Sequence, residues 1–252
     1  MSRLSDSGFE EELQISPVKA WHECDYEESC FIIQRHNELQ FLAQNCLAHQ
    51  PQARSKLVSW LIAVHRQLKL SFESCCLAVN IMDRFLITTS VAADCFQLLG
   101  VTSLLIATKQ VEVYSPRITQ LLSLCCNSFS REQLCNLECL VLLRLNFRLA
   151  APTLAFFLDY FTSRLTGYQS GGAIDEMVSA PDTEAELSLA DYTFNKYMPS
   201  VIVQCAVKLA KDLLKEYPPL TCENQVLFQQ CTDDLKLLVS LNQDAVQDLI
   251  RL

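Results

Sequence analysis

The apolar segment from Ala92 to Val111 limits the possible folds of this chain more than any other feature. Its central letters, LLGVTSLLIAT, place apolar side chains on nearly every side of a helix. A helix that is apolar all round has to be enclosed by other parts of the protein. Half of the 252 residues are hydrophobic, which is enough material to enclose it. No apolar run reaches the roughly 18 residues that a membrane span requires, so we expect a buried central helix and no membrane partner.

Further helices are predicted on both sides of this segment. Ser71 is a good N-cap, and Ser130 with Gln133 forms a capping-box pattern. Ser115-Pro116 is typical of a cap followed by a first-turn proline. The predicted ranges are about 56–70, 72–86, 115–126 and 130–145, preceded by a helix over 25–49 that Pro51 ends or closely follows.

The second half repeats the helical pattern. Its predicted helices cover about 153–161, 187–196, 199–215, 226–241 and 245–252. Residues 166–186 hold three of the five glycines and a proline, so we expect an irregular insert there. No period-two strand pattern persists anywhere. The predicted domains are a flexible acidic tail over 1–24, a helical unit over 25–150 and a second helical unit over 151–252.

Charge and glycine content exclude several function classes. The net charge is −9, although residues 51–150 carry 10 basic and 6 acidic side chains, a net +4. An acidic protein repels phosphate backbones, so nucleic acid is not expected as the main partner. Only 5 glycines leave little room for loops that cradle phosphates, and no cofactor is predicted.

The 13 cysteines are interpreted as small core residues in a reducing, intracellular compartment. No C-x-x-C pair occurs, and only four histidines could act as further ligands, so no metal site is predicted. The first residues have no apolar core of the kind that a secretory signal needs.

Lys109 and Glu138 are the two charges whose positions call for an explanation. Lys109 follows the apolar run of the central helix, and Glu138 lies within the apolar run LCNLECLVLL. A lone charge next to apolar surface is costly unless it is paired. Two interpretations remain open: a partly exposed ion pair that stabilises the fold, or a contact with a partner protein.

Four motifs resemble the cyclin family. RSKLVSWL from Arg54, AVNIMDRFL from Ala78, LIATK ending at Lys109 and LNFRLAAPT from Leu145 follow one another in the family's order and spacing. They resemble the opening of the cyclin box, its second-helix signature, its L-A-S-K segment and the passage into the second box. The resemblance covers residues 25–252. It implies an all-α fold of two tandem five-helix cyclin-box domains with an N-terminal helix, in which the second box could be abbreviated.

The resemblance also implies a function and its site. The chain would be a non-catalytic activating subunit of a cyclin-dependent kinase. Lys109 and Glu138 would hold the loop that leads into the regulatory helix of the kinase. Leu142, Phe147 and Leu149 occupy positions that the family uses for apolar contacts with the kinase. Cyclins further imply a location in the cytoplasm and the nucleus.

A second family site docks substrate peptides that carry an Arg-x-Leu motif. Leu57, Trp60 and Gln97 match the groove of this site, whereas simple core packing explains Trp60 equally well. Ala53 and Lys56 stand where the family has large apolar residues, and Ala63 replaces the acid that pairs with the arginine of the peptide. We therefore expect peptide docking of the usual kind to be weakened or absent.

Arg54, Asp83 and Arg84 lie inside the box signatures, and the resemblance assigns them to internal hydrogen-bonded structure. Ser16-Pro17 and Ser115-Pro116 are minimal sites for proline-directed phosphorylation. The first lies in the predicted tail, while the second is interpreted as a helix start.

Two stretches, one from Val91 to Leu105 and one from Phe129 to Glu138, resemble one branch of the family. That branch is associated with cell-cycle control and with the centriole amplification that precedes the growth of multiple cilia. An alternative function is a kinase-independent cyclin-fold scaffold for a transcription factor or DNA. A helical enzyme acting on DNA fits less well, because the chain lacks the glycine-rich turns that grip DNA.

Overall fold

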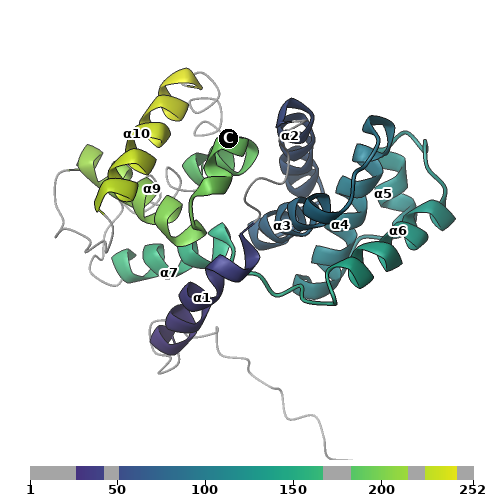
Figure 1. Ribbon diagram of the computed structural model, residues 1–252, viewed down its shortest axis with the longest axis horizontal. Helices are drawn as coiled ribbons and strands as arrows, with labels where there is room; N and C mark the ends of the chain where they lie inside the picture. Colours follow the sequence, from purple (N-terminus) through teal and green to yellow (C-terminus); the bar gives the residue numbers. More distant parts are fainter. Residues whose placement is uncertain (1–26, 43–50, 167–182, 215–224, 243–252) are drawn as a thin grey trace, which may run out of the picture.

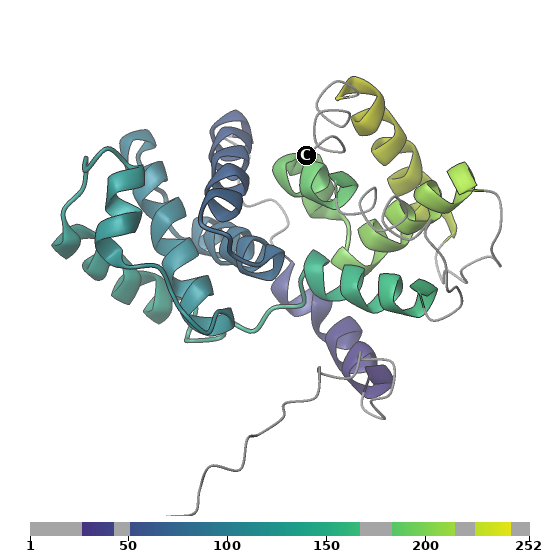
Figure 2. The same ribbon diagram turned by 180° about the vertical axis from the view of Figure 1, so that it is seen from behind.

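The computed structural model describes residues 27–42, 51–166, 183–214 and 225–242, and all regular structure within these ranges is helical. Figures 1 and 2 show two groups of helices, α2 to α6 on one side and α7, α9 and α10 on the other. The predicted all-α class is therefore confirmed. The helices are α1 (Glu27–Phe41), α2 (Pro51–Gln67), α3 (Phe72–Thr88), α4 (Phe96–Val111), α5 (Ile118–Leu124), α6 (Arg131–Arg144), α7 (Leu154–Thr166), α9 (Pro199–Leu214) and α10 (Gln225–Leu241). Two 3-10 helices, η2 (Ala93–Cys95) and η3 (Tyr192–Lys196), and a helical segment over 183–190 complete the described structure.

Helix α4 forms the centre of the first group, as its sequence predicts. Every residue from Leu98 to Thr108 is buried, and α2, α3, α5 and α6 pack around it. A Cβ atom at Gly100 would lie only 2.8 Å from Cδ1 of Leu57 on α2. Glycine at this position therefore permits the close approach of α2 and α4.

The caps predicted at Ser71 and Ser130 are confirmed. The helix starts predicted near residues 56 and 115 are wrong. Ser71 Oγ accepts a hydrogen bond from the Ser74 amide, and Ser130 and Gln133 form the reciprocal capping box of α6. Helix α2 begins at Pro51, in the first-turn position that proline favours. Helix α5 begins at Ile118, which leaves Ser115 outside the helix.

The second group has a core of its own, built mainly from α7, α9 and α10. The predicted insert is too long at its C-terminal end, because residues 183–190 are helical. Thr166, where the predicted insert begins, is the last residue of α7. Residues 167–182, the tail over 1–24 and the predicted helix over 245–252 lie outside the described residues. Cys76 of α3 reaches into this core from the first group, so the two cores adjoin.

Helix α1 is attached mainly to the second group. The Phe31 ring stacks on Tyr160 of α7 with 4.2 Å between ring centroids. The buried carboxylate of Glu38 accepts hydrogen bonds from the amide and hydroxyl of Ser200, at 2.6 and 2.8 Å, in the first turn of α9. Desolvation raises the pKa of Glu38, although the two Ser200 hydrogen bonds and Arg35 oppose this effect. At its other end Phe41 enters the first core and its carbonyl accepts from Asn80.

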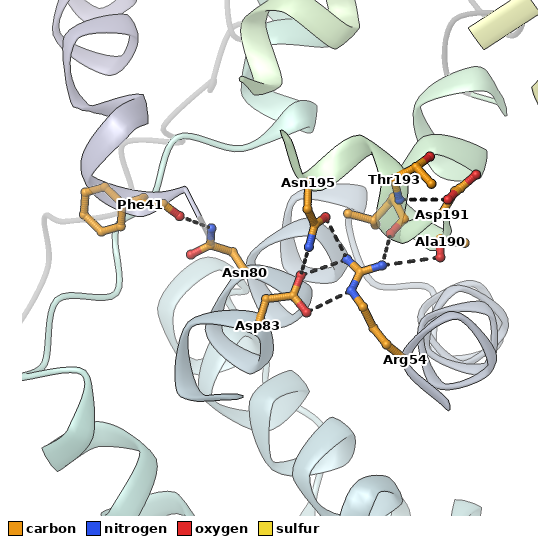
Figure 3. A network of polar contacts seen from close by, with 9 residues as sticks. Phe41, Arg54, Asn80, Asp83, Ala190, Asp191, Thr193 and Asn195 are labelled. Carbon is orange, nitrogen blue, oxygen red and sulfur yellow. Dashed lines mark hydrogen bonds and ion pairs between the residues drawn. The ribbon is translucent and has the colours of Figure 1, made fainter. Parts of the chain in front are cut away.

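A buried network joins the two groups of helices (Figure 3). Arg54 of α2 donates to both carboxylate oxygens of Asp83 on α3, at 2.9 and 2.8 Å. The same guanidinium donates to the carbonyl oxygens of Leu189 and Ala190 and to Asn195 of the second group. The Arg54 and Asp83 side chains are 1% and 5% exposed. These contacts agree with the internal role that the resemblance implies for both residues.

Glu184 gives the stability of the chain a predictable pH dependence. The residue is 6% exposed, and its Oε2 atom has no hydrogen-bond partner among the described residues. Burial raises the pKa of this carboxyl from 4.5 to about 8. The folded state therefore holds its proton where the unfolded state has lost it. Its stabilising contribution is complete below pH 4.5 and is lost as the pH rises through about 8.

We therefore expect Glu184→Gln to raise the free energy of unfolding at pH 8 by roughly 2–4 kcal/mol, since one pKa unit corresponds to about 1.4 kcal/mol. Urea denaturation of both proteins between pH 4.5 and pH 8 measures this difference. Near pH 4.5 the two curves should converge. Parallel pH profiles for the two proteins would contradict the assignment.

Candidate functional site

Lys109 and Glu138 meet at the surface of the first group of helices. Lys109 lies in the last turn of α4, Glu138 lies on α6, and these two helices pack against each other. The distance from Lys109 Nζ to Glu138 Oε1 is 2.5 Å. The lysine side chain is 49% exposed and the glutamate 14%. The described part of the chain therefore leaves the pair open to solvent on the lysine side.

The exposure of this pair favours a partner contact over a purely stabilising role. An ion pair open to water contributes about 0–1 kcal/mol to folding. The fixed geometry nevertheless keeps a donor and an acceptor in place for polar groups of another protein, which gives specificity and orientation. The pair is therefore expected to contribute more to the specificity of binding than to the free energy of folding.

Helix α6 also presents apolar side chains on its outward side. Only Leu134 and Val141 of this helix are buried, while Leu140 is 40% and Leu143 is 64% exposed. A single exposed leucine is ordinary, but several on one helix are typical of a contact surface. Sequence reasoning missed both leucines. Their exposure could have been predicted, because the apolar residues of α6 are distributed over more of its circumference than the side that packs against the core.

Phe147 is held outward just after α6. Asn146 and Phe147 have φ angles of 50° and 57°, in the left-handed region, and the Phe147 amide donates to the Leu142 carbonyl at 3.0 Å. The Phe147 side chain is 65% exposed. A bulky residue in this region costs about 1–3 kcal/mol. The backbone of Phe147 is therefore strained while its ring is exposed to solvent, and strained residues cluster at functional sites.

Leu142 and Leu149 are the other two predicted contact residues. Both are half-buried and pack against the first core, so each offers only part of its surface to a partner. Val113 and Tyr114, which sequence reasoning missed, follow α4 directly and are each 88% exposed. Leu142 lies four residues after Glu138 and so shares its face of α6. We call Lys109, Glu138, Leu142, Phe147 and Leu149 together the α4–α6 surface.

The predicted docking residues lie elsewhere on the first group. Leu57 is buried, and Trp60 packs against the first core. Gln97 is half-buried in the first turn of α4, and Lys56 is exposed. Because Leu57 and Trp60 both take part in core packing, peptide docking stays a prediction.

Arg84, the third residue of the box signatures, belongs to a separate contact. Its guanidinium lies 4.7 Å from the centroid of the Phe41 ring and donates to Asn80. Burial, reinforced by the charge of Arg148, lowers the pKa of Arg84 to about 10. Arg84 therefore helps to attach the end of α1 to α3.

Neither a metal centre nor a membrane span emerges from the described residues. No group of three or more histidine, cysteine or acidic side chains there could hold a metal ion. None of the helices in the described ranges is sufficiently long and apolar to cross a bilayer. All ten described cysteines are free thiols, and five of them are buried.

Models of protein families match nearly the whole chain. The N-terminal domain of cyclins matches residues 29–150, and the C-terminal domain of cyclins matches residues 152–252. Cyclin-O protein B of Xenopus laevis is 51% identical over 239 residues, which are 90% of this chain and 66% of that protein. Cyclin-O of Homo sapiens is 49% identical over 237 residues, which are 90% of this chain and 67% of that protein. The chain thus spans about two thirds of the length of these curated relatives.

Solved structures show the same architecture. A viral cyclin from herpesvirus saimiri has a TM-score of 0.64 at 17% identity and covers 90% of this chain and 96% of its own. A chain of the CAK complex of Chaetomium thermophilum has a TM-score of 0.50 at 18% identity, over 89% of this chain and 70% of that one. At such identities these likenesses establish the fold, two tandem helical domains.

Proposed function

Because this chain belongs to the cyclin family, we propose that it is the regulatory subunit of a cyclin-dependent serine/threonine kinase. Cyclins as a family regulate kinases and do not catalyse phosphoryl transfer themselves. The observation that carries the proposal is the Lys109–Glu138 pair, held at 2.5 Å with the lysine half-exposed beside an apolar helix. The α4–α6 surface is the proposed kinase-binding site.

The mechanism is a shift of population in the kinase. Lys109 and Glu138 bind polar groups of the loop that leads into the regulatory helix, and Leu142, Phe147 and Leu149 pack against apolar groups nearby. If these contacts form only with the active arrangement, binding favours that arrangement. A shift from 1:99 to 99:1 requires a difference in affinity of about 10⁴-fold, or about 5.5 kcal/mol. An aromatic anchor together with a desolvated charge pair is of the right order to supply it.

We propose further that the chain acts in cell-cycle control and, like the branch that it resembles, in centriole amplification before multiple cilia form. Support for the finer role comes from the 49–51% identity to Cyclin-O proteins. Its proposed locations are the cytoplasm and the nucleus, where such kinases meet their substrates. Peptides with Arg-x-Leu motifs are a proposed second class of partner.

Affinity purification of the tagged chain tests the proposal. We expect a cyclin-dependent kinase and an ATP-dependent peptide kinase activity to co-purify from dividing cells and from cells that amplify centrioles. Tracing the tag in both compartments during the same experiment checks the locations. Recovery of DNA-binding proteins whose elution depends on nuclease treatment, without any kinase, would instead support the scaffold alternative.

A further inference from the structure

Ser115 lies in a loop and not at a helix start. The interpretation of Ser115-Pro116 as cap and first turn is wrong, because α5 begins at Ile118 after Arg117. Arg117 has φ −69° and ψ 144°, which is extended backbone. The helical explanation for a serine before a proline at this position is therefore removed.

The Ser115 hydroxyl is open to solvent and unused. Ser115 is exposed, and the two residues before it are each 88% exposed. Within the described ranges its hydroxyl makes no hydrogen bond. Ser123 on α5 differs, because its hydroxyl donates to the Gln120 carbonyl at 2.7 Å. An enzyme can reach Ser115 without first breaking a contact of the fold.

Pro116 restricts both the shape of the segment and the class of enzyme that accepts it. The residue before a proline is biased away from the helical region, so Ser115 is presented in an extended segment. Proline has no amide N–H, so an enzyme that binds here has to accommodate an apolar ring in place of a hydrogen-bond donor. Proline-directed serine/threonine kinases are enzymes of this kind.

The surroundings of Ser115 suit a phosphoryl group. Ser115 and Arg117 line one open hollow of about 380 Å³, together with Tyr114 and Gln120. A phosphoserine carries about −1.5 to −2 charges and forms strong hydrogen bonds with arginine. Arg117 would therefore lie next to the new charge.

We propose that Ser115 is a phosphorylation site for a proline-directed serine/threonine kinase, with Arg117 as the counter-ion of the phosphoserine. Ser115 Oγ attacks the γ-phosphorus of ATP, and the bond from that phosphorus to the β–γ bridging oxygen breaks. ADP leaves, and the hydroxyl proton passes to a base of the kinase. This site does not depend on whether the chain itself binds a kinase.

Mass spectrometry of the purified chain tests the site. The chain has two Ser-Pro pairs, so Ser16→Ala serves as the background that leaves Ser115 alone. We expect an active proline-directed kinase, already paired with a different cyclin, to add one phosphoryl group from ATP, which peptide mapping places on Ser115. Incorporation should be lost in Ser115→Ala and Pro116→Ala and kept in Ser115→Thr. It should also be kept in Ser128→Ala, which changes an exposed loop serine that no proline follows.

The phosphorylated protein tests the role of Arg117. The second pKa of phosphoserine is ordinarily about 6, and a neighbouring guanidinium should lower it. A ³¹P NMR titration should therefore give a lower midpoint for the parent than for Arg117→Ala. Equal titration midpoints for the parent and Arg117→Ala would show that Arg117 is not the counter-ion of the phosphoserine. Absence of phosphate on Ser115 in the Ser16→Ala background would overturn the site.

Discussion

Replacing Glu138 by lysine is expected to weaken kinase binding by about 30-fold to several thousand-fold, because the bound kinase would bury the exposed pair, and removing one member of a charge pair buried in an interface costs about 2–5 kcal/mol. The new lysine also faces Lys109, so the surface would present two like charges to the kinase loop. The fold should tolerate the change, since the exposed pair is worth only about 0–1 kcal/mol. Titration of the purified kinase measures binding, and circular dichroism verifies the helices.

Two matched variants separate binding from stability. Glu132→Lys makes the same change of charge in the exposed first turn of α6, and it should bind the kinase normally. The exchange Lys109→Glu with Glu138→Lys restores an ion pair with reversed polarity. If the pair served stability alone, the exchange would restore the wild-type behaviour. We expect stability to recover while kinase binding stays weak, and full recovery of binding would remove the main support for the site.

Replacing Asp83 by asparagine is expected to lower the free energy of unfolding by about 3–5 kcal/mol, because it removes the carboxylate that pairs with the buried Arg54 guanidinium through two hydrogen bonds. Arg54 cannot turn toward water, since its side chain is 1% exposed. Its other contacts include the neutral oxygens of Leu189, Ala190 and Asn195 in the second group and the ring of Tyr192. Urea denaturation of both proteins measures the difference.

A double replacement provides the control for this prediction. Arg54→Met with Asp83→Leu removes both charges, and apolar pairs of similar volume often replace buried ion pairs at little cost. The double variant should therefore be more stable than Asp83→Asn. A cost below about 1 kcal/mol for Asp83→Asn would match an exposed pair and would argue against the network.

The sequence predicted those parts of the fold that local chemistry decides. The burial of α4 followed from its all-round apolar pattern, and the capping box at Ser130 followed from side chains three residues apart. The start of α5 was wrong because Ser115-Pro116 fits a loop as well as a helix start. The attachment of α1 could not be predicted from the sequence, because the partners of Phe31 and Glu38 lie more than a hundred residues away along the chain.

In the candidate site, too, the sequence predicted some features and not others. A physical argument about lone charges drew attention to Lys109 and Glu138, and the structure brings them together. Whether an apolar residue of α6 faces the core or the solvent depends on how the helix is rotated against α4. The family resemblance, and not the helical pattern, named Leu142 as a contact residue, and that stays a prediction. Leu142 is half-buried, and the exposure of Leu143 was not predicted. The left-handed backbone of Phe147 has no signature in the letters around it.

The attachment of α1 has a consequence for synthesis on the ribosome. Glu38 cannot form its hydrogen bonds until Ser200 has been synthesised, 162 residues later. At about 5–20 residues per second, the nascent chain carries this helix undocked for roughly ten seconds or more. Until α7 has been translated, Phe31 also lacks its aromatic neighbours on that helix. Of the described helices, α1 is thus the first to emerge and among the last to be secured.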